Sequence, residues 1–329
     1  MKKVLIITHS RDNICIDTVS SFIQEMGGEA IRFDVDRYPL DYMLTSTYRK
    51  KKWRVLLDDG SKVHDLDDAA AIWFRRSFNI GQGITEVLEQ EYVEPSMGEI
   101  KRTIYGMLEA LNCFKMERYS VYRRLDSKEE QLRVAERNGL LIPETCITND
   151  PAALRSFMQK QGAPLITKMQ SAFAIYRGED EHVVFTNELG PGQLDDLETL
   201  QYCPMTFQEK LEKKLELRVT IVGREIFAFS VDSQKISNAG IDWRKEGMAL
   251  LNDWQPYTLP ENIHRSLMGL MDAYGLNYGA IDIILTPDDR YYFLEINAAG
   301  EYFWLDRLCD HAISRHMAAV LLGEASRRA

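Results

Sequence analysis

The sequence predicts a mixed α/β protein, part α/β and part α+β, with more than one domain. The first 33 residues read as strand, helix and strand, which is typical of the start of a small α/β domain. Two later stretches, residues 216–231 and 276–304, alternate apolar and polar residues about a turn signal, as β-hairpins do. With 329 residues, 45% hydrophobic and 27% charged, the chain has room for two or three globular domains.

The opening unit follows from short-range patterns. Residues 3–8 form a short apolar run, as a buried parallel strand does, and residues 30–33 form the next strand. The helix between them ends at Gly27-Gly28. Neither a GxGxxG nor a GxxxxGK[ST] motif is present, so no nucleotide is assigned to this unit. The apolar side of the helix consists of Ile14, Val19, Phe22, Ile23 and Met26.

Two further strands are expected at residues 43–55 and 70–74, and the second ends in Arg75-Arg76. Paired arginines at a strand end are suited to bind a carboxylate or a phosphate through their planar guanidinium groups. The alternative interpretation is a pair of solvated surface charges.

A long amphipathic helix, interrupted at Pro95, is expected over residues 86–111. Residues 112–126 then lead into a second domain. Ser127 and Glu130 form a capping box, which starts a helix that ends near Gly139.

Two lysines in this middle region are candidate phosphate contacts. Lys128 lies in the first helical turn, where a cation opposes the helix dipole unless an anion is near. Lys168 ends a strand at residues 165–168, and a hairpin is expected around residues 173–185. The intervening loop would cover a phosphate chain, although it contains no glycine.

The last third contains a strand beginning at Met205 and the hairpin of residues 216–231, which turns at Gly223-Arg224. Glu216 and Arg218 share one face of this hairpin, so they point toward one site. The alternative is an exposed ion pair of little energetic weight. A helix between Pro260 and Gly275 follows, and a final helix is expected over residues 311–325.

The hairpin of residues 276–304 carries the most distinctive chemistry. With Asp288-Asp289 as its loop, Asp282 faces Glu295, and Asn297 lies on the same face. Facing carboxylates are unfavourable unless a cation neutralises them, and this oxygen-only set suits Mg²⁺ or Mn²⁺. The alternative is a solvated polar face. The opposite, apolar face would hold Ile281, Ile283, Leu285, Tyr292, Leu294 and Ile296.

Composition excludes several classes. A net charge of −10 argues against a sequence-blind nucleic-acid binder, and no segment is long and apolar enough to be a membrane span. Five scattered cysteines without a CxxC pair indicate a reducing compartment, so a cytoplasmic protein is expected. The six histidines are dispersed, which gives little support to a nucleophilic triad.

Taken together, these features resemble the ATP-grasp carboxylate ligases along the whole chain. The closest resemblance is to the ribosomal-protein glutamate ligase branch and, within it, to the microviridin-type macrocyclases, also called graspetide ligases. The stretches that carry it are IRFDVDRYP (31–39), IWFRR (72–76), CPMTFQE (203–209), ELRV (216–219), DWR (242–244), EIN (295–297) and Gly300-Glu301.

The resemblance implies the ATP-grasp fold, with an N-terminal α/β domain (1–120), a central subdomain (121–205) and a C-terminal subdomain with the Mg²⁺ site (206–329). It also implies site residues. The phosphates of ATP would contact Lys128 and Lys168, and Glu216 would hold the ribose. The nucleotide's adenine would lie along Gln208, Glu209, Lys210 and Leu211. The γ-phosphate and the acyl phosphate would face Arg218 and Arg244, and two Mg²⁺ ions would bind Asp282, Glu295 and Asn297.

The implied reaction is ATP-dependent macrocyclisation of a precursor peptide with a leader and an acidic core, by a homodimeric enzyme. A Thr or Ser hydroxyl would attack an activated Asp or Glu to give an ester, with Arg75 and Arg76 as substrate contacts. Alternatives are lysine attack to give an amide, a ligase that adds an amino acid to a peptide or protein end, and an ATP-binding regulatory module. Nucleic acid and membrane are not expected as partners.

Overall fold

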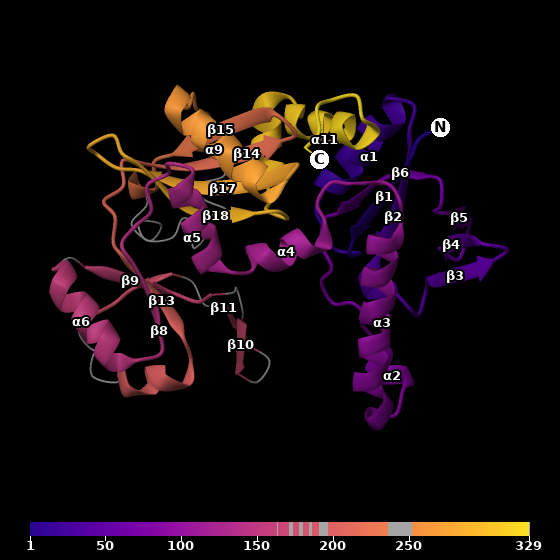
Figure 1. Ribbon diagram of the computed structural model, residues 1–329, viewed down its shortest axis with the longest axis horizontal. Coiled ribbons are helices and arrows are strands. Elements are labelled where there is room, and N and C mark those ends of the chain that lie inside the picture. The colour runs from indigo at the N-terminus through magenta and orange to yellow at the C-terminus, as the bar shows by residue number, and fades with distance from the viewer. Residues whose placement is uncertain are drawn as a thin grey trace.

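The computed structural model describes residues 1–328 apart from residue 163 and residues 171–173, 178–179, 184–185, 191–196 and 236–251. Its strands form separate sheets in an N-terminal, a central and a C-terminal region (Figure 1). Among the described residues, no helix has the length and apolar character needed to cross a bilayer.

The N-terminal region is built on a parallel sheet with the order β2-β1-β6-β7. Alternate residues of β1 enter two cores: Val4 and Ile6 face α1, whereas Leu5 and Ile7 face α3. Burial on both faces explains why β1 is continuously apolar. The elements are β1 (Lys3–Thr8), α1 (Cys15–Glu25), β2 (Glu29–Asp34), η1 (Val35–Arg37), β6 (Ala69–Phe74), α2 (Ile84–Val87), α3 (Gln90–Ala110) and β7 (Phe114–Lys115).

A separate antiparallel sheet, β3-β4-β5, projects from this region (Figure 1). Its strands are β3 (Met43–Arg49), β4 (Lys52–Asp58) and β5 (Val63–Asp65). The single strand predicted over residues 43–55 is therefore wrong: Lys50 and Lys51 turn the chain back with positive φ angles. In helix α1, Ile14 is exposed, and Cys15 and Ile16 take the buried positions instead.

The central region contains an antiparallel sheet with the order β12-β9-β13-β8 and the pair β10–β11. Its elements are β8 (Thr145–Thr148), α6 (Pro151–Gln161), β9 (Leu165–Lys168), β10 (Ala174–Arg177), β11 (Asp180–Val183), β12 (Asn187–Glu188), η2 (Leu197–Tyr202) and β13 (Met205–Glu209). Strand β13 pairs with both β8 and β9, so the predicted division after residue 205 cuts through a strand of this sheet. Parts of the predicted hairpin at residues 173–185 lie outside the described residues.

The C-terminal region holds the sheet β16-β15-β14-β17-β18 and its covering helices. Helix α5 packs here rather than on the central sheet: Leu132 and Ala135 are buried in the C-terminal core, and the Gln131 side chain accepts from the Ile296 N–H at 2.9 Å. The elements are β14 (Leu215–Val222), β15 (Glu225–Val231), η3 (Ser233–Lys235), β16 (Gln255–Pro256), α9 (Glu261–Tyr274), β17 (Tyr278–Leu285), β18 (Tyr291–Asn297), α10 (Phe303–Asp306), η5 (Arg307–Cys309) and α11 (Ala312–Leu322). The connecting helices are α4 (Tyr119–Leu125) and α5 (Lys128–Arg137).

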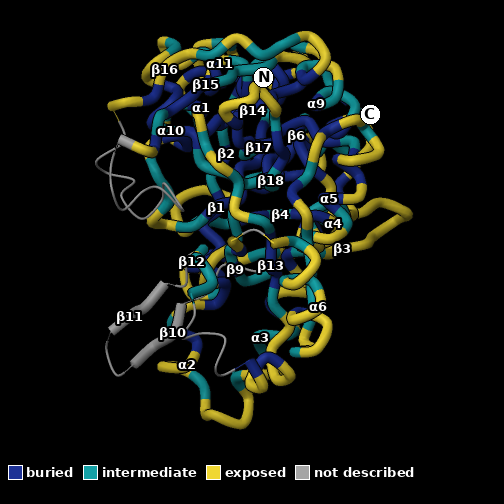
Figure 2. The backbone as a smooth tube through the Cα atoms, turned by 90° about the vertical axis from the view of Figure 1, so that its left-hand side faces the viewer, coloured by how far each residue is buried: buried dark blue, intermediate teal, exposed yellow. Residues whose placement is uncertain are grey.

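The N- and C-terminal regions share one hydrophobic core. Helix α11 packs beside α1, and Met317 and Leu321 are buried in the same cluster as Val4 of the first strand. Figure 1 shows α11 and α1 side by side, and Figure 2 shows buried residues concentrated where the two regions meet. Helix α11, close to the chain end, therefore completes the hydrophobic core on the α1 side of the N-terminal sheet.

Helix ends agree with their local signals. The Ser127 side chain accepts the N–H of Glu130 at 3.2 Å, as predicted, although the Glu130 carboxylate binds Arg124 instead of closing the capping box. Helix α9 ends at Gly275 in the left-handed conformation.

Candidate functional site

The site centres on the hairpin of β17 and β18, where Asp282 faces Glu295. The predicted two-residue loop is wrong, because the turn extends from Thr286 to Arg290 and shifts the pairing by one: Ile283 faces Phe293. A β-bulge between Asp282 and Ile283 restores the predicted pairing beyond it. The predicted pairing of Asp282 with Glu295 is therefore confirmed, but it depends on the β-bulge and not on the turn alone.

The bulge also changes the apolar face. Phe293 is fully buried, whereas Leu294, predicted to lie on the core face, is only half-buried. A bulge leaves one residue of its strand unpaired, and here that residue is Leu294.

Each carboxylate has a cation of the chain beside it. Arg218 Nη1 lies 2.7 Å from Asp282 Oδ1, because the two residues face each other across β14 and β17. Lys128 Nζ, at the start of α5, lies 2.5 Å from Glu295 Oε2, and Asn297 Nδ2 donates to Glu295 Oε1 at 3.3 Å. Five predicted site residues from four elements thus make direct contact.

The unfavourable position of Lys128 in the first turn of α5 is explained by this contact. The anion that its position in the first turn calls for is Glu295, a residue 167 positions further along the chain. The pair is shielded from water, since each side chain is 17% exposed.

Arg218 is the most enclosed member of the site, with 5% of its surface exposed. Its Nη2 donates to the Glu301 carbonyl oxygen at 3.0 Å. Gly300 explains this close approach: a Cβ there would lie 2.7 Å from Arg218 Nη2 and 2.4 Å from the Ala280 Cβ. Only glycine fits where the loop after β18 crosses the arginine.

Glu216, predicted to hold a ribose, lies on the same face of β14 as Arg218 and pairs with Lys213 at 2.9 Å. Burial raises the pKa of the Glu216 carboxyl above its ordinary value, against the pull of the Lys213 ammonium. A buried acceptor at this position suits a hydroxyl donor.

The predicted adenine residues lie at the end of β13 and in the connection to β14. Lys210 donates its N–H to the Pro164 carbonyl oxygen at 2.8 Å, whereas the N–H of Leu211 has no partner among the described residues. Gln208 is buried, and its amide donates to Thr145 Oγ1 at 2.9 Å. Lys168 ends β9 in the same sheet, opposite Thr206. Arg244 lies outside the described residues.

Arg75 and Arg76 form a second cluster, at the carboxyl end of β6. Arg75 Nη2 binds Glu301 Oε2 at 2.7 Å, and Arg76 binds the other oxygen of the same carboxylate. Asn13 also donates to Glu301, and Asp12 lies 3.8 Å from Arg75. Burial acts to raise the pKa of Asp12, but Arg75 and the Thr8 hydroxyl hold it below its ordinary value.

Sequence reasoning did not assign a role to Asp12, Asn13 or Glu301. A usable signal exists for the first two, since β1 and β6 are parallel neighbours and their carboxyl ends meet at one edge. Glu301 is 225 positions from Arg76, and no local pattern connects them.

The chemistry of the central donor set fits a divalent cation that prefers oxygen ligands. Asp282 and Glu295 supply carboxylates from facing strands, and Asn297 adds an amide. The described residues hold no group of three or more His, Cys, Asp or Glu side chains suited to a metal.

Comparison with known proteins finds one matching family model and several similar solved structures. A family model described as the MvdD pre-ATP grasp domain matches residues 3–123. A RiPP-associated ATP-grasp ligase from Chryseobacterium gregarium, solved in complex with ADP and a leader and core peptide, is 48% identical, with 100% of this chain and 98% of that chain covered and a TM-score of 0.97.

Two macrocyclases from Microcystis aeruginosa are also similar. MdnC, solved with the precursor peptide MdnA, is 40% identical over 98% of this chain and 99% of that chain, with a TM-score of 0.87. MdnB is 32% identical over the same shares, with a TM-score of 0.82. No match is found among curated proteins.

Proposed function

The chain belongs to the ATP-grasp ligases that act on ribosomally synthesised, modified peptides, and on that premise we propose that it closes rings within such a peptide. The observation that carries the proposal is the contact set of Lys128, Arg218, Asp282, Glu295 and Asn297. It combines cations for phosphate with oxygen ligands for a metal, in a chain 48% identical to a ligase solved with ADP and peptide.

The chemistry has two steps. A side-chain carboxylate of the peptide attacks the γ-phosphorus of ATP, ADP leaves, and an acyl phosphate forms. A hydroxyl or amine of the same peptide then attacks the acyl carbon, inorganic phosphate leaves, and the nucleophile loses its proton. Activation is needed because a free carboxylate has no good leaving group.

The residues would supply positioning and charge, as in other phosphoryl transfers. We assign Lys128 and Lys168 to the phosphates, and Arg218 and Arg244 to the transferred phosphoryl group and the acyl phosphate. Arg218 is held from two sides, by Asp282 and by the Glu301 carbonyl, so its charge is preorganised.

We assign Asp282, Glu295 and Asn297 to two Mg²⁺ ions, a set that also suits Mn²⁺. Bound there, the metal would offset negative charge on the phosphoryl oxygens. The chain's own contribution is to hold both carboxylates in place, through Arg218 at 2.7 Å from Asp282 and Lys128 at 2.5 Å from Glu295.

For the nucleoside, we propose that the backbone of Glu209 and Leu211 contacts adenine, beside Gln208 and Lys210. Glu216 would accept the ribose hydroxyls. Two observations support this assignment: the N–H of Leu211 has no partner among the residues that the structure describes, and Glu216 is buried and paired.

For the reacting peptide, Arg76 is a better candidate contact than Arg75. Arg75 is 1% exposed, and its guanidinium binds Glu301 and the Ala299 carbonyl oxygen, whereas the Arg76 side chain is 19% exposed. Arg75 therefore has an internal role, and Arg76 could meet a substrate carboxylate.

We propose ester formation by Thr or Ser as the reaction, with amide formation by Lys as the alternative. The test is the intact mass of an acidic candidate precursor peptide after incubation with ATP and Mg²⁺. Stepwise loss of water with equal release of ADP supports the proposal, and hydroxide then opens esters but not amides. A mass gain would indicate a ligase that adds an amino acid.

The variant Glu295→Gln tests the metal assignment, because it removes one carboxylate charge without changing the shape of the side chain. We expect it to abolish ADP release while thermal unfolding stays cooperative. ADP release by this variant would contradict the metal assignment. Bound ATP without turnover in the wild-type protein would favour the regulatory module.

We also propose a homodimer located in the cytoplasm. All five cysteines are free, in keeping with a reducing compartment. Light scattering of the purified protein would test the dimer, and a monomer at micromolar concentration would refute it.

A further inference from the structure

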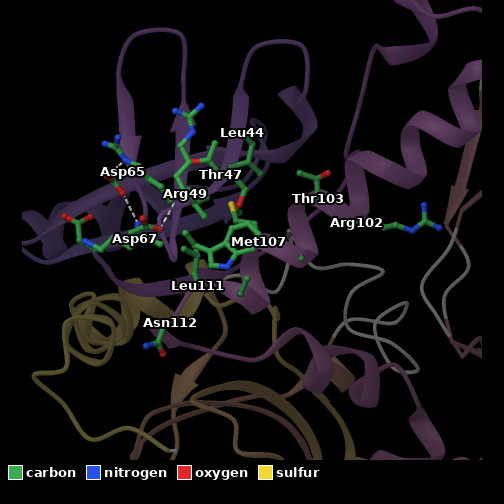
Figure 3. Close-up of a pocket in the computed structure, with 18 residues that line it drawn as sticks. Leu44, Thr47, Arg49, Asp65, Asp67, Arg102, Thr103, Met107, Leu111 and Asn112 are labelled. Atoms are coloured by element: carbon green, nitrogen blue, oxygen red, sulfur yellow. Dashed lines mark hydrogen bonds and ion pairs between the residues drawn. The ribbon is translucent and has the colours of Figure 1, made fainter.

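One groove formed by the described residues has no part in the proposed function. It has a volume of about 1310 Å³ and lies between hairpin β3–β4 and helix α3 (Figure 3). Acidic and basic side chains line it together, and Arg54 pairs with Asp65 of the same lining at 3.0 Å. The charge of this groove therefore selects no class of ligand.

The loop after β18, by contrast, is in direct contact with the site, and side chains hold it through its backbone. Three successive carbonyl oxygens, those of residues 299–301, each accept a hydrogen bond from a buried side chain. The donors are, in that order, Arg75, the Tyr278 hydroxyl at 2.6 Å and Arg218 Nη2 at 3.0 Å. Arg75 directly follows β6, whereas the other two lie in β17 and β14. The position of the loop therefore depends on the N-terminal and the C-terminal sheet together.

Tyr278 is itself firmly placed. It is 1% exposed, its N–H donates to Glu117 Oε1 at 2.8 Å, and its ring lies 5.9 Å from the ring of Tyr302. Burial raises the pKa of the Tyr278 hydroxyl above its ordinary value, against the pull of Arg75 and Arg218. The hydroxyl therefore keeps its proton at neutral pH and donates it to the loop.

The loop crosses the face of β17 that carries both Tyr278 and Asp282. Side chains alternate along a strand, so Tyr278, Ala280 and Asp282 share that face. A Cβ at Gly300 would lie 2.4 Å from the Ala280 Cβ, which places the crossing between the tyrosine and the carboxylate. The loop is thus anchored on one side of Ala280 by Tyr278, and on the other side it reaches Arg218, the partner of Asp282.

This arrangement fixes the Arg218 guanidinium. Nη1 lies 2.7 Å from Asp282 Oδ1, and Nη2 donates to the Glu301 carbonyl oxygen at 3.0 Å. A single contact would leave the group free to turn, whereas two contacts from different directions fix its plane. A charge held in place before the reaction stabilises the developing phosphoryl charge without reorganisation. A shift of the loop would therefore move a donor of the site.

Resting on the proposed function, we propose that Tyr278 is a positioning residue for phosphoryl transfer. Its hydroxyl holds the Gly300 carbonyl, the carbonyl of the next residue holds Arg218, and Arg218 faces the transferred phosphoryl group. Tyr278 is buried and its proton is committed to the loop, so the residue acts through Arg218 and not as an acid or a base. Its effect therefore falls on the rate of the reaction as well as on stability.

Tyr278→Phe removes one donor and changes neither the charge nor the shape of the core. Arg75, the neighbouring donor, would be a poorer probe, because it also binds the Glu301 carboxylate. In the variant the Gly300 carbonyl oxygen still lies 3.5 Å from Arg75 Nη1, and the ring contact with Tyr302 is kept. We therefore expect the variant to fold with a cooperative urea transition.

Tyr274→Phe is the matched control. Tyr274 lies in α9 and is 3% exposed, and its hydroxyl oxygen is buried with no hydrogen-bond partner among the described residues. Both substitutions delete one hydroxyl from a buried tyrosine, but only Tyr278→Phe deletes a contact to the loop. A difference between the variants therefore reports that contact and not the loss of an oxygen atom.

Hydrogen exchange of the loop tests the contact without turnover. The Gly300 N–H donates to the Asn297 carbonyl oxygen at 3.2 Å, and this turn bond opens when the loop loosens. In the peptic fragment that covers residues 298–304, we expect about fivefold faster exchange for Tyr278→Phe than for wild type and no change for Tyr274→Phe. Equal exchange in wild type and Tyr278→Phe would overturn the proposal.

Steady-state release of ADP tests the consequence for the reaction. With ATP, Mg²⁺ and the acidic candidate precursor peptide, Tyr278→Phe should lower kcat about tenfold and leave the KM for ATP within about twofold of wild type. The loss falls on kcat because Arg218 acts on the transferred phosphoryl group and not on the bound nucleotide as a whole. Unchanged kcat despite faster loop exchange would overturn the proposal, since Tyr278 would then be structural only. So would an equal loss of kcat in Tyr274→Phe.

These outcomes separate the two proposals. Wild-type protein that releases no ADP and forms no cyclic product refutes the proposed function, whereas the exchange result does not depend on turnover. Wild-type activity that Tyr278→Phe retains in full refutes the positioning role alone.

Discussion

Glu301→Gln should lower the free energy of unfolding by more than the loss of an exposed ion pair does, although the Glu301 side chain is partly exposed. The Glu301 carboxylate binds both Arg75 and Arg76 and accepts from Asn13, so it joins the loop after β18 to the N-terminal sheet. The substitution preserves shape and one acceptor but removes the charge.

The magnitude follows from burial. Removing one partner of a fully buried ion pair costs about 3–5 kcal/mol, because the other charge stays desolvated. Arg75 meets that condition at 1% exposure, but the Glu301 side chain is 25% exposed and Asp12 remains 3.8 Å from Arg75. We therefore expect a loss of about 2 kcal/mol, below the fully buried range.

Urea unfolding followed by fluorescence measures this loss. Glu99→Gln is the matched control, because Glu99 also pairs with an arginine, Arg102, at 2.9 Å, but both side chains are about 75% exposed. An exposed pair of this kind contributes less than about 0.5 kcal/mol. Equal midpoints for the two variants would refute the role assigned to Glu301.

Three other substitutions test separate parts of the structure. Gly300→Ala should lower kcat for ADP release about 100-fold, because its Cβ would displace Arg218; an active variant would contradict this packing. Burial raises the pKa of Glu117 well above 4.5, so wild-type stability falls as pH rises toward that raised pKa. Glu117→Gln should therefore be more stable than wild type at pH 8 in urea unfolding, with the gain lost below pH 4.5; a gain independent of pH would refute the assignment. Ser127→Ala removes the cap of α5 and should cost about 1 kcal/mol in the same assay, whereas no change would mean that the cap is dispensable.

Local patterns were sufficient for most elements of the fold. Residues 3–8 and 165–168 form strands with the predicted bounds, and the helix predicted between Pro260 and Gly275 spans Glu261–Tyr274. These predictions succeed because side-chain alternation, caps and glycine stops act over a few residues.

The candidate site was predictable where one element carries its parts. Asp282, Glu295 and Asn297 lie on one hairpin, so alternation places them on one face, and the β-bulge preserved that outcome. The turn itself was not predicted, because three residues lie between Thr286 and Arg290, the last of them Asp289 at a positive φ, where the prediction assumed a two-residue loop.

The sequence by itself determined most of the strands, the helix ends, the oxygen-ligand face and the resemblance to a ligase family. Only the tertiary structure decided that Lys128 meets Glu295, that Glu301 joins Arg75 to Arg76, and that α11 completes the N-terminal core. The physical reason is sequence separation. Contacts between residues hundreds of positions apart depend on how finished elements pack, and no periodicity within a segment encodes that packing.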